Sequence, residues 1–165
     1  MANADHAFIR QAIAMADTSA HSGGDPFGAL LVYQGKVVVS SIDKSIAYSD
    51  PTAHAELILI SEYCRSNQLI SLEGHTLYCN TEPCMMCCGA IHWARISRVV
   101  FSVSQKMLQT FSGGKPKSSS QSLLNADRQR VEIVGPVLPE EGLRIYQTHS
   151  FVSKKDRHKQ FWQHD

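Results

Sequence analysis

The chain has 165 residues, of which 43% are hydrophobic, and its 16 basic and 15 acidic side chains give a formal net charge of +1. These values are typical of one compact globular domain spanning 1–165, and they argue against a nucleic-acid coat protein or a polybasic protein of membrane surfaces. No run approaches the ~18 apolar residues that span a bilayer, and the first residues lack the basic and then apolar pattern of a signal peptide. We therefore expect a cytoplasmic protein with no membrane partner.

The first three expected elements are a helix and a hairpin. Apolar residues recur at steps of three and four over residues 5–20, which predicts an amphipathic helix. Two strand-like runs follow at 27–33 and 36–42, separated by two residues that include Gly35, and they predict a β-hairpin with its tight turn at that glycine.

The middle of the chain predicts helix, strand and helix. Residues 53–65 have the composition of a helix, with Asp50 or Thr52 as its N-cap. A short β-prone run covers 76–80, and the small and apolar residues of 84–94 predict a buried helix.

Two more strands are expected at 98–103 and 131–134, with a polar, helix-capable connection that includes a flexible loop at 112–120. Residues 143–155 predict a last helix, and 153–165 form a C-terminal tail. Strands that alternate with helices pair in parallel and carry helices on both faces. The fold class is therefore α/β, a three-layer α/β/α sandwich with a five-stranded mixed sheet that opens with one antiparallel hairpin.

Cysteine usage points to a metal. The chain has five cysteines, an odd number that does not suit a closed disulfide framework, and a reducing cytoplasm disfavours disulfides. His54 precedes Cys84 by 30 positions, and Cys87 follows three residues later. Zinc accepts nitrogen and sulfur ligands together, and three protein ligands leave the fourth tetrahedral position for water. We therefore predict a catalytic Zn²⁺ site.

Glu56 lies two residues after His54, in the first turn of the predicted helix. There it can exchange protons with water at the metal without binding the metal itself, so we assign it the role of catalytic proton shuttle. A purely structural zinc needs a fourth protein ligand. Cys88 is the nearest candidate, but on a helix its side chain points about 100° away from that of Cys87, so we assign it to packing.

The pattern His54-x-Glu56 followed by Pro83-Cys84-x-x-Cys87 is the signature of zinc deaminases. The chain resembles the cytidine deaminase superfamily, and within it the branch of guanine deaminases and tRNA adenosine deaminases. The resemblance covers about residues 5–134 and includes the sequences DPFGA, DPTAHAE and TEPC. It implies a three-layer α/β/α fold, one zinc per subunit, hydrolytic release of ammonia from a ring amine, and a homodimer or larger oligomer.

Three residues bear on the substrate. Phe27 and Trp93 resemble the guanine deaminases, and two aromatic rings near the zinc would enclose a free planar base, although both rings also suit a protein core. Asp43 stands where family members usually carry an asparagine that binds the base. An ionised aspartate only accepts hydrogen bonds, so the base should present N–H groups to it.

These residues favour a small heterocyclic base as substrate, a guanine-like purine, pterin or aminotriazine. A second hypothesis is a tRNA-specific adenosine deaminase that acts on an anticodon loop, which would make nucleic acid a partner. It is motivated by the basic residues within 154–159. A third is a zinc-stabilised binding module without turnover, but such a module has no use for Glu56.

Overall fold

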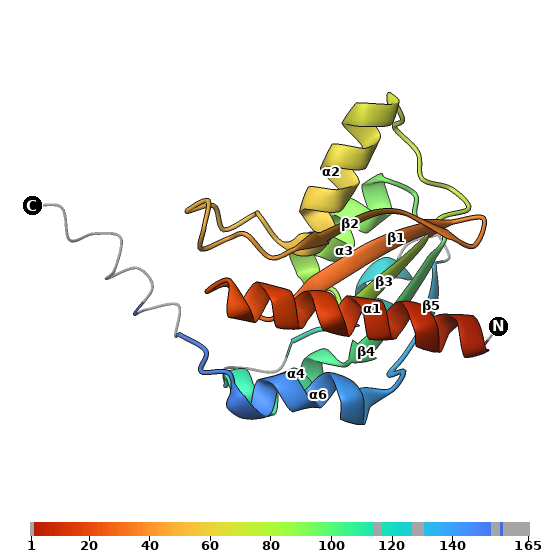
Figure 1. Ribbon diagram of the computed structural model, residues 1–165. Helices are drawn as coiled ribbons and strands as arrows, with labels where there is room; N and C mark the ends of the chain where they lie inside the picture. The colour runs from red at the N-terminus through yellow and green to blue at the C-terminus, as the bar shows by residue number, and fades with distance from the viewer. Residues whose placement is uncertain (1, 114–116, 127–130, 153–155, 157–165) are drawn as a thin grey trace, which may run out of the picture.

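The computed structural model describes residues 2–113, 117–126, 131–152 and 156 (Figure 1). Its centre is a five-stranded sheet with the strand order β2-β1-β3-β4-β5. The strands are β1 (Gly28–Tyr33), β2 (Lys36–Ile42), β3 (Thr76–Thr81), β4 (Arg98–Val103) and β5 (Glu132–Val134).

The sheet is mixed, as expected. β1 pairs antiparallel with both β2 and β3, whereas β4 pairs in parallel with β3 and with β5. The β1–β2 turn lies at Gln34 and Gly35, whose φ angles of 49° and 75° are those of a tight hairpin turn. The predicted hairpin is thus confirmed, and the parallel pairs follow because helices cross between their strands.

Helices cover both faces of this sheet (Figure 1). α1 (Ala2–His21) and α6 (Pro139–Thr148) pack on one face, where α1 contacts β1 and β3 and α6 contacts β4. On the other face lie α2 (Ala55–Asn67), α3 (Met85–Trp93) and α5 (Ser120–Leu124). α4 (Gln105–Ser112) follows β4 and contacts α6. This arrangement confirms the α/β/α fold class.

Side chains that alternate between the two faces of the central strands form the two apolar layers on either side of the sheet. Leu30 and Val32 of β1 pack with Ile9 and Ala12 of α1, whereas the intervening Leu31 packs toward α2 and α3. Successive side chains of a strand point to opposite faces, so β1, buried on both, is almost continuously apolar. None of the described helices is long and apolar enough to cross a membrane.

The start of α2 differs from the prediction. The helix begins at Ala55, two residues later than expected, and its N-cap is His54, with no capping side-chain hydrogen bond. Asp50 instead accepts hydrogen bonds from the backbone N–H and the hydroxyl of Thr52, at 2.8 and 2.7 Å. The two expected caps therefore stabilise a turn before the helix rather than the helix itself.

The bounds predicted for the last helix are wrong. α6 begins at Pro139 and ends at Thr148. Proline in the first turn and the acidic Glu140 and Glu141 after it favour this earlier start. His149 is already extended, and the tail residues 153–155 and 157–165, like residues 114–116 of the expected loop, lie outside the described residues.

Candidate active site

The predicted metal ligands lie at the N-termini of two neighbouring helices. His54 is the N-cap of α2, and Cys84, which follows the carboxyl end of β3, is the N-cap of α3. Both residues have extended backbones, and neither uses its side chain to cap its helix. Their side chains are therefore free to turn toward each other, and Cys87, one turn into α3, completes the group.

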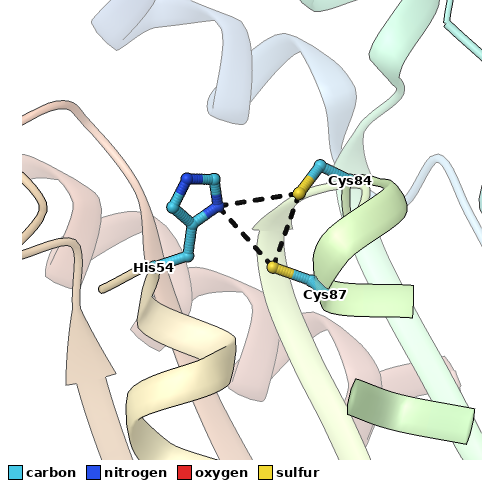
Figure 2. A group of neighbouring side chains, drawn as sticks. All are labelled: His54, Cys84 and Cys87. Carbon is cyan, nitrogen blue, oxygen red and sulfur yellow. Dashed lines mark hydrogen bonds between the residues drawn. The ribbon is translucent and has the colours of Figure 1, made fainter. Parts of the chain in front are cut away.

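Figure 2 shows His54, Cys84 and Cys87 pointing toward a common centre. The Nδ1 atom of His54 lies 3.6 Å from each sulfur, and the two sulfurs are 3.6 Å apart. Zinc bonded at about 2.3 Å to sulfur and about 2.0 Å to nitrogen, with tetrahedral angles, needs separations of about 3.5 to 3.8 Å between these atoms. The triangle fits zinc, and its three protein ligands leave one coordination position for chemistry.

The electrostatics of the ligand triad suit a cation. The hydrogen bond with Cys87 lowers the pKa of Cys84 to about 3, and His54 contributes to the same shift. The hydrogen bond with Cys84 in turn raises the pKa of His54 to about 9. A lowered pKa of Cys84 favours the thiolate form that zinc binds, and zinc binding displaces the protons of the other ligands.

Glu56 lies beside the triad in the first turn of α2, with 8% of its surface exposed. Burial raises the pKa of its carboxyl to about 7, while His54 and a hydrogen bond with Cys87 oppose that shift. A carboxyl group with a pKa near neutrality both accepts and donates protons readily. Glu56 thus lies beside the metal ligands with a carboxyl group that titrates near neutrality, and its role as proton shuttle stays a prediction.

Phe27 and Asp43 come together at the open end of the β1–β2 hairpin. The backbone N–H of Asp43 donates to the carbonyl of Phe27 at 3.0 Å. Asp43 is 4% exposed, and its Oδ1 accepts hydrogen bonds from the N–H and the hydroxyl of Ser45 at 3.1 and 2.6 Å. Burial raises the pKa of Asp43, and the hydrogen bonds from Ser45 together with the charge of His54 oppose this shift.

Trp93 does not join this group within one chain. It is the last residue of α3 and is 82% exposed, whereas Cys84 directly precedes the first residue of the same helix. The two helix ends are about 12 Å apart along the axis, at 1.5 Å per residue. The structure therefore brings Phe27 and Asp43 to the triad's end of the sheet and leaves Trp93 apart.

The aromatic neighbours of Phe27 come instead from the end of the chain. Its ring centroid lies 6.3 Å from that of Tyr146 in α6 and 6.2 Å from that of Phe151. Neither residue is among those that the sequence predicts for the site. Both follow β5 and carry no motif, so local sequence offers no signal for them.

Asn80 is a third residue for which the sequence predicts no role at the site. Its Oδ1 accepts from the N–H of Gly28, and its Nδ2 donates to the carbonyl of Pro26, at 2.9 and 3.0 Å. These bonds join the end of β3 to both neighbours of Phe27. Its place next to the TEPC motif is the one hint in the sequence.

Comparisons with known proteins agree with this geometry. Residues 2–103 match the family model described as the cytidine and deoxycytidylate deaminase zinc-binding region. A tRNA-specific adenosine deaminase of Buchnera aphidicola subsp. Schizaphis graminum is 34% identical over 143 residues, 87% of this chain and 91% of that protein. A probable cytosine deaminase of Schizosaccharomyces pombe is 33% identical over 144 residues, 84% of this chain and 88% of that protein.

A solved structure, that of guanine deaminase from Bacillus subtilis, is 27% identical with a TM-score of 0.62 and covers 94% of this chain and 91% of that one. The names of these three relatives give three different amines, so similarity by itself does not choose a substrate. What the three names share is a deaminase, an enzyme that removes an amino group. The matched region contains the whole metal triad and Glu56, and the chain therefore belongs to the cytidine and deoxycytidylate deaminase family.

Proposed function

We propose that this protein deaminates a free, guanine-like base, a purine, pterin or aminotriazine, and releases ammonia. The observation that carries the proposal is that Asp43, a buried carboxylate, is hydrogen-bonded through its backbone N–H to the carbonyl of Phe27, so that both residues lie at the end of the sheet that bears the metal triad. A carboxylate accepts hydrogen bonds from ring N–H groups, and an aromatic ring stacks on a planar base. Together they suit a small heterocycle without a sugar or phosphate contact.

The reaction is a hydrolysis in which the exocyclic C–N bond to the amino group breaks and the ring carbon gains the oxygen of water. Zinc, when bound by the triad, lowers the pKa of water to about 7. Glu56 accepts a proton as the oxygen adds and donates one to the departing nitrogen, which leaves as ammonia. Asp43 and Phe27 orient the base so that its amino-bearing carbon faces the triad.

A tRNA-specific adenosine deaminase is the second candidate, and the Buchnera relative favours it. That relative matches over 143 residues, 87% of this chain, whereas the guanine deaminase of Bacillus subtilis, at 36% identity, matches over 96 residues, 58% of this chain. In this reading the substrate is an adenosine of an anticodon loop, and the protein binds nucleic acid through phosphate contacts whose strength falls with salt.

Ammonia release from the zinc-loaded protein separates the two candidates. The panel comprises guanine, adenine, cytosine, ammeline, a pterin and an adenosine-containing anticodon stem-loop, with Glu56→Gln as the inactive control. Turnover of a free base supports the proposal. Turnover of the stem-loop alone supports the second candidate. If the zinc-loaded protein turns over neither a free base nor the stem-loop, both candidate functions are contradicted.

We also propose that the protein is a homodimer that uses the exposed face of α3. Met85, Gly89 and Trp93 follow one another at steps of four on this face, and Met85 and Trp93 are 76% and 82% exposed. Methionine and tryptophan are enriched in interfaces, and charged residues are depleted from interface cores. Sedimentation of wild type and Trp93→Lys tests this: a dimer that the substitution dissociates supports it, and a monomeric wild type contradicts it.

A further inference from the structure

Glu82 occupies the position between β3 and the first cysteine ligand, and its main chain is held on both sides. Its N–H donates to the carbonyl of Val103, the last residue of β4, at 2.7 Å. Its own carbonyl accepts a hydrogen bond of 2.5 Å from the side-chain Nε2 of Gln105. The segment that leaves β3 is thus tied to the end of the neighbouring strand.

The carboxylate of Glu82 makes a second set of bonds. Its Oε2 accepts from the backbone N–H of Gln105, the first residue of α4, at 2.8 Å. Its Oε1 accepts from the backbone N–H and the hydroxyl of Ser120, the first residue of α5, both at 2.7 Å. One side chain, 5% exposed, therefore joins the starts of two helices to the end of β3.

The backbone between Glu82 and the metal ligand Cys84 has little conformational freedom. Only Pro83 separates Glu82 from Cys84, and the proline ring fixes one of its two backbone angles. The carbonyls of Pro83 and Cys84 accept from the thiol and the N–H of Cys88, at 3.6 and 2.8 Å. A shift of Glu82 is therefore passed on to the sulfur of Cys84.

We propose that Glu82 is a positioning residue for the metal site: its carboxylate, by tying α4 and α5 to the end of β3, sets where the Cys84 sulfur lies relative to Cys87 and His54. The proposal rests on the proposed function only in that the triad binds zinc. A buried carboxylate is costly unless it is fully hydrogen-bonded, and this one has three donors shared between its two oxygens. Groups that orient metal ligands in this way commonly change metal affinity 10–100-fold when replaced.

Glu82→Gln tests the role in the full-length protein. Glutamine offers one acceptor oxygen, so its NH₂ group must face either the N–H of Gln105 or that of Ser120, and one helix start is released. The readouts are the zinc dissociation constant and the sulfur-to-metal charge-transfer absorption of the protein loaded with Co²⁺. Neither readout needs a substrate, so both remain valid tests of Glu82 even if the proposed substrate is wrong.

Asp5→Asn is the matched control. Asp5 is also a buried carboxylate with three donors, the hydroxyl of Tyr78 and two nitrogens of Arg98, but it lies in α1 on the other face of the sheet. We expect Glu82→Gln to weaken zinc binding by about tenfold or more and to alter the Co²⁺ spectrum. Asp5→Asn should leave both unchanged, although it lowers stability.

A Glu82→Gln protein that is less stable but binds zinc and absorbs like wild type overturns the proposal, because the residue then only stabilises the fold. If Glu82→Gln does not fold, Ser120→Ala takes its place, since it removes one donor and keeps the carboxylate. A Co²⁺ spectrum of Ser120→Ala that is shifted from that of wild type supports the proposal, and a spectrum identical to wild type contradicts it.

Discussion

Asn80 and Tyr146, 66 positions apart in the chain, share a hydrogen bond of 2.8 Å from the Nδ2 of the amide to the phenolic oxygen. The same hydroxyl bonds Thr81 and donates to the carbonyl of Pro26 at 3.2 Å. One side chain of α6 thus reaches the end of β3, two residues before the metal-binding motif begins at Pro83, and also the loop that carries Phe27. α6 therefore holds the loop that carries Phe27 against the end of β3.

Tyr146→Phe should lower both stability and activity. The substitution keeps the ring that packs on Phe27 but leaves the Thr81 hydroxyl and the Asn80 amide without this partner, which costs about 1–3 kcal/mol of unfolding free energy. Urea denaturation measures the loss. Tyr48→Phe, at an exposed position, is the control and should change little. Equal unfolding midpoints for the two variants would contradict the role of the buried hydroxyl.

Glu56→Gln should retain zinc and lose at least about a hundredfold in kcat, because glutamine keeps the size of the side chain but cannot carry a proton. Metal content by mass spectrometry and ammonia release are measured on the same sample. Glu62→Gln, in the same helix but exposed, is the control. Turnover of the Glu56→Gln protein at the wild-type rate would exclude Glu56 as the proton shuttle.

Asp43→Asn should change which base is preferred more than how fast the best base reacts. A carboxamide offers donors as well as an acceptor, so a base that presents a carbonyl gains relative to one that presents only N–H groups. The ratio of kcat/KM for guanine to that for a base richer in N–H donors should rise by about tenfold, the scale of one hydrogen bond. An unchanged ratio would show that Asp43 does not touch the base.

The Asp5–Arg98 pair predicts a pH-dependent difference in stability. The hydrogen bonds from Arg98 lower the pKa of Asp5 below its ordinary value of 3.8, with a further contribution from the Tyr78 hydroxyl. A carboxyl group with a lowered pKa stabilises the folded state above its unfolded pKa, and this contribution disappears as the pH falls through the folded pKa.

Asp5→Asn should therefore cost roughly 1.5–3 kcal/mol at pH 7, and the gap to wild type should shrink as the pH falls from about 4 toward 2. Denaturation over this pH range measures it. Glu141→Gln, which breaks an exposed pair with Arg10, should show little difference at any pH. A gap that stays constant from pH 7 to pH 2 would contradict the assigned pKa shift.

Much of the fold follows from local sequence. The hairpin turn needs positive φ angles, which Gly35 adopts without strain, and the apolar spacing of residues 5–20 marks the buried side of α1. The ends of helices follow less directly from local sequence. Asp50 and Thr52 bond to each other instead of capping α2, and the short-range sequence is compatible with either choice.

The metal triad could be predicted from the sequence because metal ligation demands particular residue types at fixed spacings, and Glu56 lies within the same motif as His54. Only the tertiary structure decided that Trp93 lies apart from the triad, that Tyr146 and Phe151 flank Phe27, and that Glu82 joins three segments. These contacts depend on which elements pack together across the sheet, a property of the whole fold. The residues next to a given residue in the sequence do not predict such contacts.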